Sequence, residues 1–469
     1  MIIMLFIAIS AGFSSCKKYL EVTPKSSLSE GQLFTSEPGF QQALSGVYSQ
    51  LAGRNLYGDK LTMGFVSALG QNYSITNNSY IQLVETRNLN YATGEVQGHI
   101  SGIWGTAYAA IAGLNKILVN SVENRKVLTD EGYALVRGEA LALRALLHFD
   151  LLRLFGKEYV TGASLKAIPY KTDITENANV PATTAEVVKF ALEDLKEAET
   201  LLKDKDPIVT RNTRSRRNRL NYYAVKGLEA RIRIYMGDKA GAAAAAAIVV
   251  NSGKYTFVTN AAASVVSAGS NVRDRLYFNE QIAMVRVREI SNWADPTYFR
   301  FNAGASYKLT RSDANFKTLY ETATGGGTDI RYLYRIELDG GVPFPSKFWQ
   351  TTTTTLDSAR LDQYVPVIRL AEMYYILAET AATPAEGFGY LNTVRINRAL
   401  PVLLTTGSQI TLNNEITKEY QKEFYAEGQL FFYYKRKNMA RMQFMTADIS
   451  QDKYVLPIPD TELEFNPNY

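Results

Sequence analysis

Cysteine and histidine are nearly absent from this chain of 469 residues, which has one cysteine and two histidines. A disulfide bridge within the chain is therefore impossible, and zinc sites built from several cysteines are excluded. Catalytic pairs of a nucleophile with a histidine base also have few places to form. Metal and thiol enzymology are accordingly not expected, and we predict no cofactor and no metal ion.

A strong excess of charge of one sign is also missing. The net charge is only +5, and the contents of 46% hydrophobic and 21% charged residues are ordinary for a globular protein. The densest basic stretch, Arg211 to Arg219, has no interleaved aromatic residues and directly precedes a predicted helix. We interpret it as a solvated loop, with a phosphate-binding patch as the alternative. Nucleic acid is not expected as a partner.

Sequence signatures of phosphate loops, calcium loops and hydrolytic sites are weak. Gly325–Gly327 lacks the Lys and Ser/Thr of a phosphate loop, and Asp204-Lys205-Asp206 lacks the glycine and the distal glutamate of a calcium loop. The pairs Asp204 with Asp206 and Glu415 with Glu419 could in principle hydrolyse glycosides. Their predicted positions on surface helix or turn favour solvating charge instead, so no enzymatic activity is predicted.

Aromatic residues are what the chain has in excess, with 30 Tyr and 21 Phe against 3 Trp. Tyrosine combines a flat apolar face with a hydroxyl that tolerates exposure, which suits the binding of sugars or partner proteins. Many of these rings are nevertheless expected in the core with the hydroxyl at its rim.

The first fifteen residues carry no charge and contain an apolar run from Ile2 to Ala11. This run is too short to cross a bilayer and has the length of a signal-peptide core. The sequence Gly12-Phe13-Ser14-Ser15-Cys16 resembles a bacterial lipobox, in which Cys16 is lipidated, for example with palmitate. We predict a lipoprotein signal peptide over 1–15 and a lipidated tether over 16–30. An ordinary secretory signal with an incidental cysteine is the alternative.

Helical periodicity dominates to about residue 251 and returns from about 366 to 435. Residues 133–155 carry two apolar stripes, which predicts a helix sandwiched between neighbours. His148 lies on the second stripe, so we interpret it as a buried packing residue. Thr183-x-x-Glu186 is typical of a capping box and predicts the start of a helix over 185–203.

Two helical hairpins are predicted. The first joins helices over 221–236 and 239–250 through the break at Gly237-Asp238. The second follows a helix around 370–377, with Thr383-Pro384-Ala385-Glu386 supplying a cap, a proline at the first helical position and a capping-box glutamate. Antiparallel pairs of this size stack as tetratricopeptide-like units, although no clean repeat of that consensus is present.

Residues 254–365 change in composition to Gly, Thr, Asn and aromatics, which predicts loops with short strands such as 281–287. Loops carried on a rigid helical scaffold are where binding residues concentrate. We therefore predict a mainly α, single domain over 31–469. Its helical scaffold covers about 36–253 and 366–436, and an irregular, ligand-facing lobe covers about 254–365.

Two loops combine aromatic rings with amide or charged side chains, as a sugar requires for stacking and hydrogen bonding. The predicted ligand-binding residues are Asn72, Tyr73, Asn77, Asn78 and Tyr80 in the first loop, and Asn292, Trp293, Asp295, Tyr298 and Arg300 in the second. Turn chemistry with ordinary packing is the alternative for each loop. Trp104 lies at helical spacing with Tyr108 and Ile111 and is predicted to be core.

An ordered set of landmarks across nearly the whole mature chain resembles the SusD/RagB family of nutrient-binding lipoproteins. The landmarks are Cys16 to Leu20, Trp104 to Leu118 with Tyr108 and Asn115, Glu139 to Gly156, Ala230 to Asp238, Arg369 to Glu379, Leu391 to Arg395, Glu423 to Gly428 with Lys435-Arg436, and Leu456 to Pro467.

This resemblance implies a single SusD-like α-helical domain that forms a lid on a SusC-like TonB-dependent transporter. Ligands in the family are mainly oligosaccharides and sometimes peptides. The chain is thus expected to be a lipid-anchored, surface-exposed protein of the outer membrane that captures an oligosaccharide and delivers it to the transporter. A peptide-binding or purely structural lid is the alternative.

Overall fold

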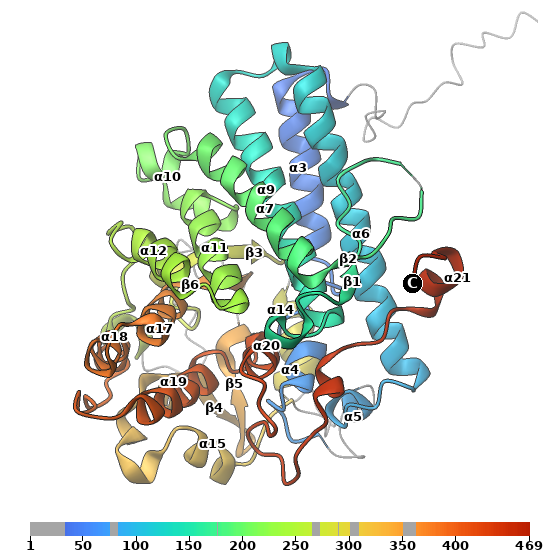
Figure 1. Cartoon of the computed structure of the whole chain (residues 1–469). Helices are drawn as coiled ribbons and strands as arrows, with labels where there is room; N and C mark the ends of the chain where they lie inside the picture. The colour runs from blue at the N-terminus through green and yellow to red at the C-terminus, as the bar shows by residue number, and fades with distance from the viewer. Residues whose placement is uncertain are drawn as a thin grey trace, which may run out of the picture.

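Four long helices run side by side in the upper part of the computed structural model (Figure 1), which describes residues 33–75, 83–175, 177–264, 273–288, 290–300, 309–349 and 363–469. They are α3 (Glu37–Leu51), α6 (Gly94–Glu123), α7 (Asp130–Phe155) and α9 (Thr184–Leu202). Helix α7 packs against both α6 and α9, and each of its residues from Gly138 to Phe155 is buried. The predicted sandwiched helix is confirmed.

The predicted hairpins continue this stack. Helix α11 (Tyr222–Met236) packs against α9 and α12 (Lys239–Val250), and α12 packs against α17 (Leu370–Thr380). Helix α17 in turn packs against α18 (Pro384–Ile396) and α19 (Gln409–Glu423), and α20 (Gln429–Arg436) follows. The α11–α12 turn passes through Gly237, whose φ of +85° is the left-handed conformation that ends many helices.

The capping predictions differ in outcome. At α9, the Glu186 N–H donates to Thr183 Oγ1 (3.2 Å) and the Thr183 N–H donates to Glu186 Oε2 (2.8 Å), so the box is complete. At α18, the Glu386 N–H donates to Thr383 Oγ1 (3.2 Å), but the Glu386 carboxylate accepts from the N–H of Ala382 (3.1 Å). The second box is therefore not reciprocal, although its cap is present.

Shorter elements complete the described part of the chain. The helices are α4 (Phe65–Leu69), α5 (Val84–Arg87), α8 (Tyr159–Gly162), α10 (Pro207–Thr210), α13 (Asn260–Ala263), α14 (Ile290–Ala294), α15 (Asp313–Leu319), α16 (Ile330–Arg335) and α21 (Asp460–Phe465). The strands form three antiparallel pairs: β1 (Lys166–Ile168) with β2 (Ala182–Thr183), β3 (Gln281–Arg286) with β6 (Tyr364–Arg369), and β4 (Ile336–Asp339) with β5 (Val342–Pro345).

The β4–β5 pair has a recognisable turn in its sequence, whereas strand β6 of the β3–β6 pair has no recognisable strand pattern. The β4–β5 hairpin turns through Gly340 and Gly341, both at positive φ, as a two-residue turn of this type requires. Helical periodicity was expected from about 366, but residues 364–369 form β6, so that boundary is wrong. All six residues of β6 are buried, and a strand buried on both faces shows no alternation in its sequence.

Buried ion pairs join the irregular lobe to the helical scaffold. Glu423 at the end of α19 is fully buried and contacts the guanidinium groups of Arg331 (2.9 Å), Arg398 (2.9 Å) and Arg369. Arg398 also pairs with Glu280 (2.6 Å), immediately before β3. Charges without access to water must be paired in this way, so the network fixes how the lobe sits on the helices.

The prediction of a solvated loop for the basic stretch is wrong for Arg216 and Arg217, whereas Arg211, Asn212 and Ser215 are exposed as predicted. Arg216 pairs with Asp206 (3.0 Å) and Glu139 (2.5 Å), and Arg217 is 2% exposed and donates to two backbone carbonyls. Neither arginine is free to bind a phosphate, since each is engaged inside the protein.

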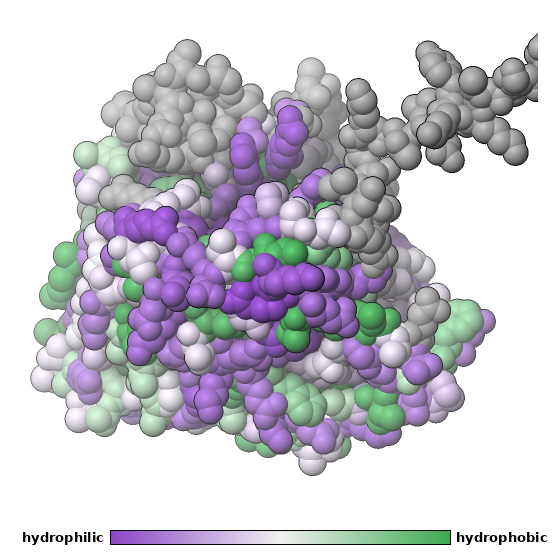
Figure 2. All heavy atoms as spheres, turned by 90° about the horizontal axis from the view of Figure 1, so that it is seen from above, coloured by the Kyte–Doolittle hydropathy of each residue, from purple (hydrophilic) through white to green (hydrophobic). Residues whose placement is uncertain are grey.

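The face seen from above in Figure 2 carries a broad hydrophilic band with small apolar patches between its charged side chains. Exposed residues at the α6–α7 turn include Glu123, Lys126 and Asp130. Within the described segments, no helix is long and apolar enough to span a bilayer.

Candidate functional site

The first predicted loop does not present its described residues to solvent. Tyr73 is fully buried, and its hydroxyl donates to the Met63 carbonyl (2.6 Å). Asn72 is 3% exposed, and its side-chain oxygen accepts from the Ala426 N–H (3.0 Å). The prediction of an exposed cluster is therefore wrong for these two residues. Asn77, Asn78 and Tyr80 lie outside the described residues.

The second predicted loop forms α14 and the π-helical turn η6 (Asp295–Phe299) that follows it. Asn292 is exposed and Trp293 and Arg300 are half-buried, whereas Asp295 (3% exposed) and Tyr298 (4%) are buried. The sequence therefore found the right segment but treated its members as equivalent. Each buried residue contacts a half-buried one: Asp295 accepts from Arg300, and Tyr298 lies edge-on to Trp293 at 6.0 Å.

Trp293 is paired with an arginine from a distant segment. The guanidinium carbon of Arg54, in the loop after α3, lies 4.6 Å from the Trp293 ring centroid, and this arginine side chain is 53% exposed. Arg54 Nε and Nη2 donate to the buried carboxylate of Asp59 (3.1 and 2.9 Å), which also accepts from the Tyr298 hydroxyl (2.9 Å). Arg54 is thus held by stacking on one side and an ion pair on the other.

The same arrangement recurs at Arg300. Its Nε donates to Asp295 Oδ2 (2.6 Å), and its guanidinium carbon lies 4.0 Å from the ring centroid of Trp349, which is half-buried. The buried Arg275 approaches the same ring at 4.5 Å. Phe299 stacks on Phe348 at 5.9 Å, and α14 contacts η9 (Ser346–Phe348), so the segments that carry the two tryptophans are neighbours.

We name Arg54, Trp293, Arg300 and Trp349 the arginine–tryptophan platform. Burial raises the pKa of Asp59, and the Arg54 guanidinium opposes that increase. Burial also raises the pKa of Asp295, and hydrogen bonding to Arg300 opposes that increase. Within the described part of the chain, Nη1 of each platform arginine has no hydrogen-bond partner. The platform therefore combines two indole rings with two guanidinium groups, each fixed by a buried carboxylate.

Arg54 and Trp349 were not among the predicted site residues. Arg54 stands in a polar turn that carries no aromatic residue at its side, and Trp349 directly precedes a stretch rich in threonine. Two of the three tryptophans in the chain nevertheless lie on the platform, and the scarcity of tryptophan was a signal that could have linked them.

In each carboxylate pair considered for glycoside hydrolysis, one member differs from the prediction, whereas Asp204 is exposed and Glu415 is half-buried. Asp206 and Glu419 are fully buried rather than on the surface, and each is engaged by arginines: Asp206 by Arg216 (3.0 Å), and Glu419 by Arg331 (2.8 Å) and Arg395 (2.9 Å). A carboxylate fixed in this way is structural. In the described residues there is also no group of three or more His, Cys, Asp or Glu side chains placed to hold a metal ion.

The two remaining core predictions are confirmed. Trp104 is 5% exposed and packs edge-on against Phe155 at 4.7 Å. His148 is fully buried and stacks on Tyr170 at 3.9 Å. Its Nε2 accepts from the Lys171 N–H (3.0 Å) while Nδ1 lies 2.9 Å from the Arg144 carbonyl, which fits a neutral imidazole that donates through Nδ1.

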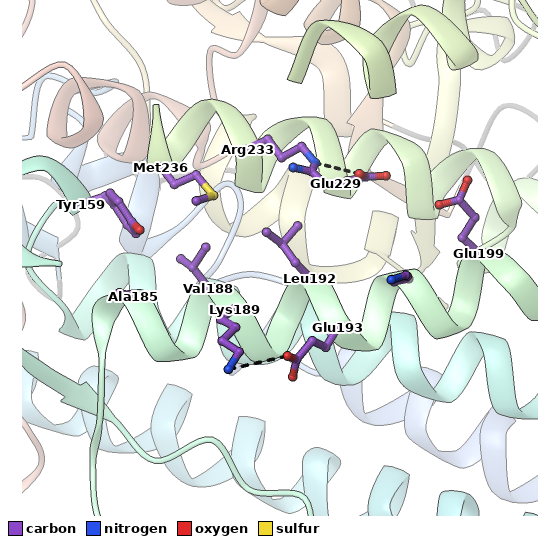
Figure 3. Close-up of a pocket in the computed structure, with 11 residues that line it drawn as sticks. Tyr159, Ala185, Val188, Lys189, Leu192, Glu193, Glu199, Glu229, Arg233 and Met236 are labelled. Atoms are coloured by element: carbon purple, nitrogen blue, oxygen red, sulfur yellow. Dashed lines mark hydrogen bonds and ion pairs between the residues drawn. The ribbon is translucent and has the colours of Figure 1, made fainter. Parts of the chain in front are cut away.

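A groove of about 570 Å³ lies between α9 and α11 (Figure 3). Val188, Leu192 and Met236 give it an apolar lining, and charged residues at its edges pair with one another, as in Arg233 with Glu229 (2.7 Å). Tyr159 is the one aromatic residue that lines it. The groove therefore lacks the combination of tryptophan rings and guanidinium groups found on the platform.

Comparison with known proteins gives the family. Residues 18–217 match the family model described as "Starch-binding associating with outer membrane", and residues 337–469 match the model of the SusD family. The chain belongs to the SusD/RagB family, as its landmarks indicated, and its helical single-domain fold is the SusD fold.

Among curated relatives, it is 25% identical over 147 residues to SusD-like protein P25 of Formosa agariphila, a match that covers 30% of this chain and 28% of that protein. It is also 25% identical over 144 residues to SusD-like protein P2 of the same organism, over 29% of this chain and 26% of that protein. The chain thus matches less than a third of the length of these two relatives.

Several solved structures have the same fold as this protein over nearly its whole chain. A SusD superfamily protein from Bacteroides thetaiotaomicron superposes with a TM-score of 0.70 at 22% identity, covering 92% of this chain and 98% of the other. A SusD-like carbohydrate-binding protein from Bacteroides vulgatus gives 0.71 at 18% identity, with 92% and 97% covered. A laminarin-binding SusD-like protein gives 0.63 at 19% identity, with 93% and 100% covered. At these identities the likeness is one of fold.

Proposed function

We propose that this protein binds oligosaccharides at the arginine–tryptophan platform and catalyses no reaction. The observation that carries the proposal is the pairing of two half-buried indoles with two guanidinium groups, each fixed by a buried carboxylate. The apolar face of a sugar ring stacks on an aromatic ring, and sugar hydroxyls accept hydrogen bonds from guanidinium N–H groups. Because the arginines are already fixed, little conformational entropy is lost on binding.

Relatives support this choice of ligand. The family model carries a starch-binding description, and structural relatives are described as carbohydrate-binding and laminarin-binding. A binding protein that must release its ligand to a transporter needs only moderate affinity, which an open platform of this kind provides.

We further propose that the protein is a surface lipoprotein, anchored in the outer membrane through Cys16, that passes its ligand to a SusC-like TonB-dependent transporter. The lipobox-like sequence and the membership of the family support this role, although Cys16 lies outside the described residues. Labelled palmitate should be incorporated into the wild-type chain and not into Cys16→Ala, and equal incorporation would contradict the anchor. A tagged chain should also copurify a TonB-dependent transporter from outer-membrane extracts.

A glycan array probed with the full chain in detergent tests the ligand class. Laminarin and starch fragments should be included, with a set of peptides printed on the same surface. We expect binding to at least one glycan and to no peptide. Binding to peptides alone would contradict the proposal and favour a peptide-binding lid, and binding to neither would favour a purely structural lid.

A further inference from the structure

A second concave site lies where the C-terminal helix α21 meets the segment from Pro169 to Asn179. Its cavity measures about 300 Å³. The residues that matter for its chemistry are Tyr108, Lys171, Asn177, Asn179, Glu462 and Phe465. A cavity of this size is at the lower end of the range for small-molecule sites and accommodates one or two sugar units.

Helix α21 is held in place by polar contacts rather than by burial. None of its six residues is buried, yet Glu462 accepts from the Trp104 indole (3.3 Å). Just beyond the helix, Asn466 donates to the Asn179 carbonyl (3.0 Å) and to Glu462 (2.8 Å). A short helix that adds nothing to the core but is fixed by several hydrogen bonds does little for stability. Its fixed position instead creates one wall of the cavity.

The opposite wall is fixed by buried residues of the scaffold. Lys171 donates its backbone N–H to fully buried His148 (3.0 Å), and its carbonyl accepts from fully buried Asn115 (3.1 Å). The Tyr108 hydroxyl donates to the Pro169 carbonyl (2.8 Å). Trp104, Tyr108 and Asn115 are among the landmarks of the sequence, and here they all act on this cavity from helix α6.

The groups that remain free at the cavity suit a sugar. Phe465 lines the cavity and is 75% exposed. The side-chain amides of Asn177 and Asn179 make no hydrogen bond within the part of the chain that the structure describes. An amide both donates and accepts, as neighbouring sugar hydroxyls require, and Lys171 is already paired with Asp173 (3.0 Å).

We infer that this cavity is a second carbohydrate subsite, which takes one or two neutral sugar units by stacking on Phe465 and bonding to Asn177 and Asn179. The inference rests on the proposed glycan-binding function. The subsite is distinct from the platform, because none of the residues that line the cavity belongs to the platform.

Tryptophan fluorescence can report on the two sites separately. Trp104 bonds to Glu462 in the cavity wall, whereas Trp293 and Trp349 belong to the platform. The full chain with Trp293→Phe and Trp349→Phe should be titrated in detergent with laminaribiose, cellobiose and maltose. We expect a saturable change in Trp104 emission with at least one sugar. Adding Phe465→Ala should weaken that binding about tenfold or more. Adding Leu463→Ala, on the same helix and 48% exposed but not lining the cavity, should leave it unchanged.

No saturable response to any of the three sugars, or an equal response after Phe465→Ala, would overturn the subsite. Thermal unfolding of each variant shows whether it remains folded, as expected for changes at exposed positions. If the wild type binds glycans on an array while Trp104 stays silent, the subsite fails and the proposed function stands. If the wild type binds no glycan at all, both fail.

Discussion

The guanidinium of Arg54 lies over the indole of Trp293, 4.6 Å from the ring centroid, although about half the chain separates the two residues in sequence. The Arg54 guanidinium is held in this position by the buried carboxylate of Asp59. Asp59→Asn should release Arg54 from its place over the ring and weaken glycan binding several-fold, by about 1 kcal/mol, since one charged contact is lost.

The chain contains a matched control for this change. Arg125 lies over Tyr133 at 4.4 Å and pairs with Asp130, outside the platform. Asp130→Asn should therefore leave glycan affinity, measured by calorimetry on the full chain, at the wild-type value. Equal affinities of the two variants would contradict a positioning role for Asp59.

His148 should make stability depend on pH. Burial lowers its pKa from 6.5 to about 3, so the folded protein resists a proton that the unfolded chain accepts. The contribution of neutral His148 to the free energy of unfolding is nearly constant above pH 6.5 and is lost as the pH falls from 6.5 towards 3. The loss is about 2 kcal/mol between pH 7 and pH 5. Urea unfolding of His148→Phe should show a smaller loss over this interval. His99→Gln, at the half-buried second histidine, should keep the wild-type loss.

Glu423 should be among the most sensitive positions for stability. Burial opposes its ionisation, but the guanidinium groups of Arg398, Arg369 and Arg331 hold its pKa well below the usual range. Glu423→Gln removes the one carboxylate that these three buried arginines share, although each keeps a second acidic partner, and it should cost about 3 kcal/mol of unfolding free energy. Glu415→Gln on the same helix, where the glutamate pairs with a partly exposed lysine, should cost less than about 1 kcal/mol. Similar denaturation midpoints for Glu423→Gln and Glu415→Gln would contradict a special role of Glu423 in stability.

Two glycines in open space should respond to alanine in opposite directions. Gly237 has φ +85° and no atom within 4 Å of an added Cβ, so Gly237→Ala should cost about 1–2 kcal/mol through backbone strain alone. Gly46 lies inside α3 and is equally open, so Gly46→Ala should raise stability by about 0.5–1 kcal/mol. Thermal melts compare the two, and a stabilising Gly237→Ala would contradict the assigned turn.

The helices and their caps were predictable because their signals are local. Apolar spacing within α7 and the Thr183–Glu186 pair lie within one segment each, so no other part of the chain is needed to recognise them. The strand β6 was not recognised because its residues are buried on both faces and its partner β3 lies about eighty residues earlier. Arg216 was misjudged for a similar reason, since Glu139, which pairs with it, is 77 residues away.

The candidate site was predictable only in part for the same physical reason. A loop rich in aromatic and polar residues identifies Trp293 and Arg300, but composition does not separate a buried support such as Tyr298 from an exposed contact. Arg54 and Trp349 reach the platform from other segments through tertiary packing. Asn72 and Tyr73 are residue types that suit a sugar site, but they are buried, and Asn72 bonds to Tyr425 and Ala426 between α19 and α20.

Calorimetry of Trp293→Ala, with the glycan that binds best on the array, tests the central claim most directly. We predict that the dissociation constant rises at least about tenfold, or about 1.4 kcal/mol, because the stacking surface is removed. Tyr374→Ala, at a half-buried aromatic residue of α17, should bind as the wild type does. Wild-type affinity in Trp293→Ala would contradict the platform as the site of glycan binding.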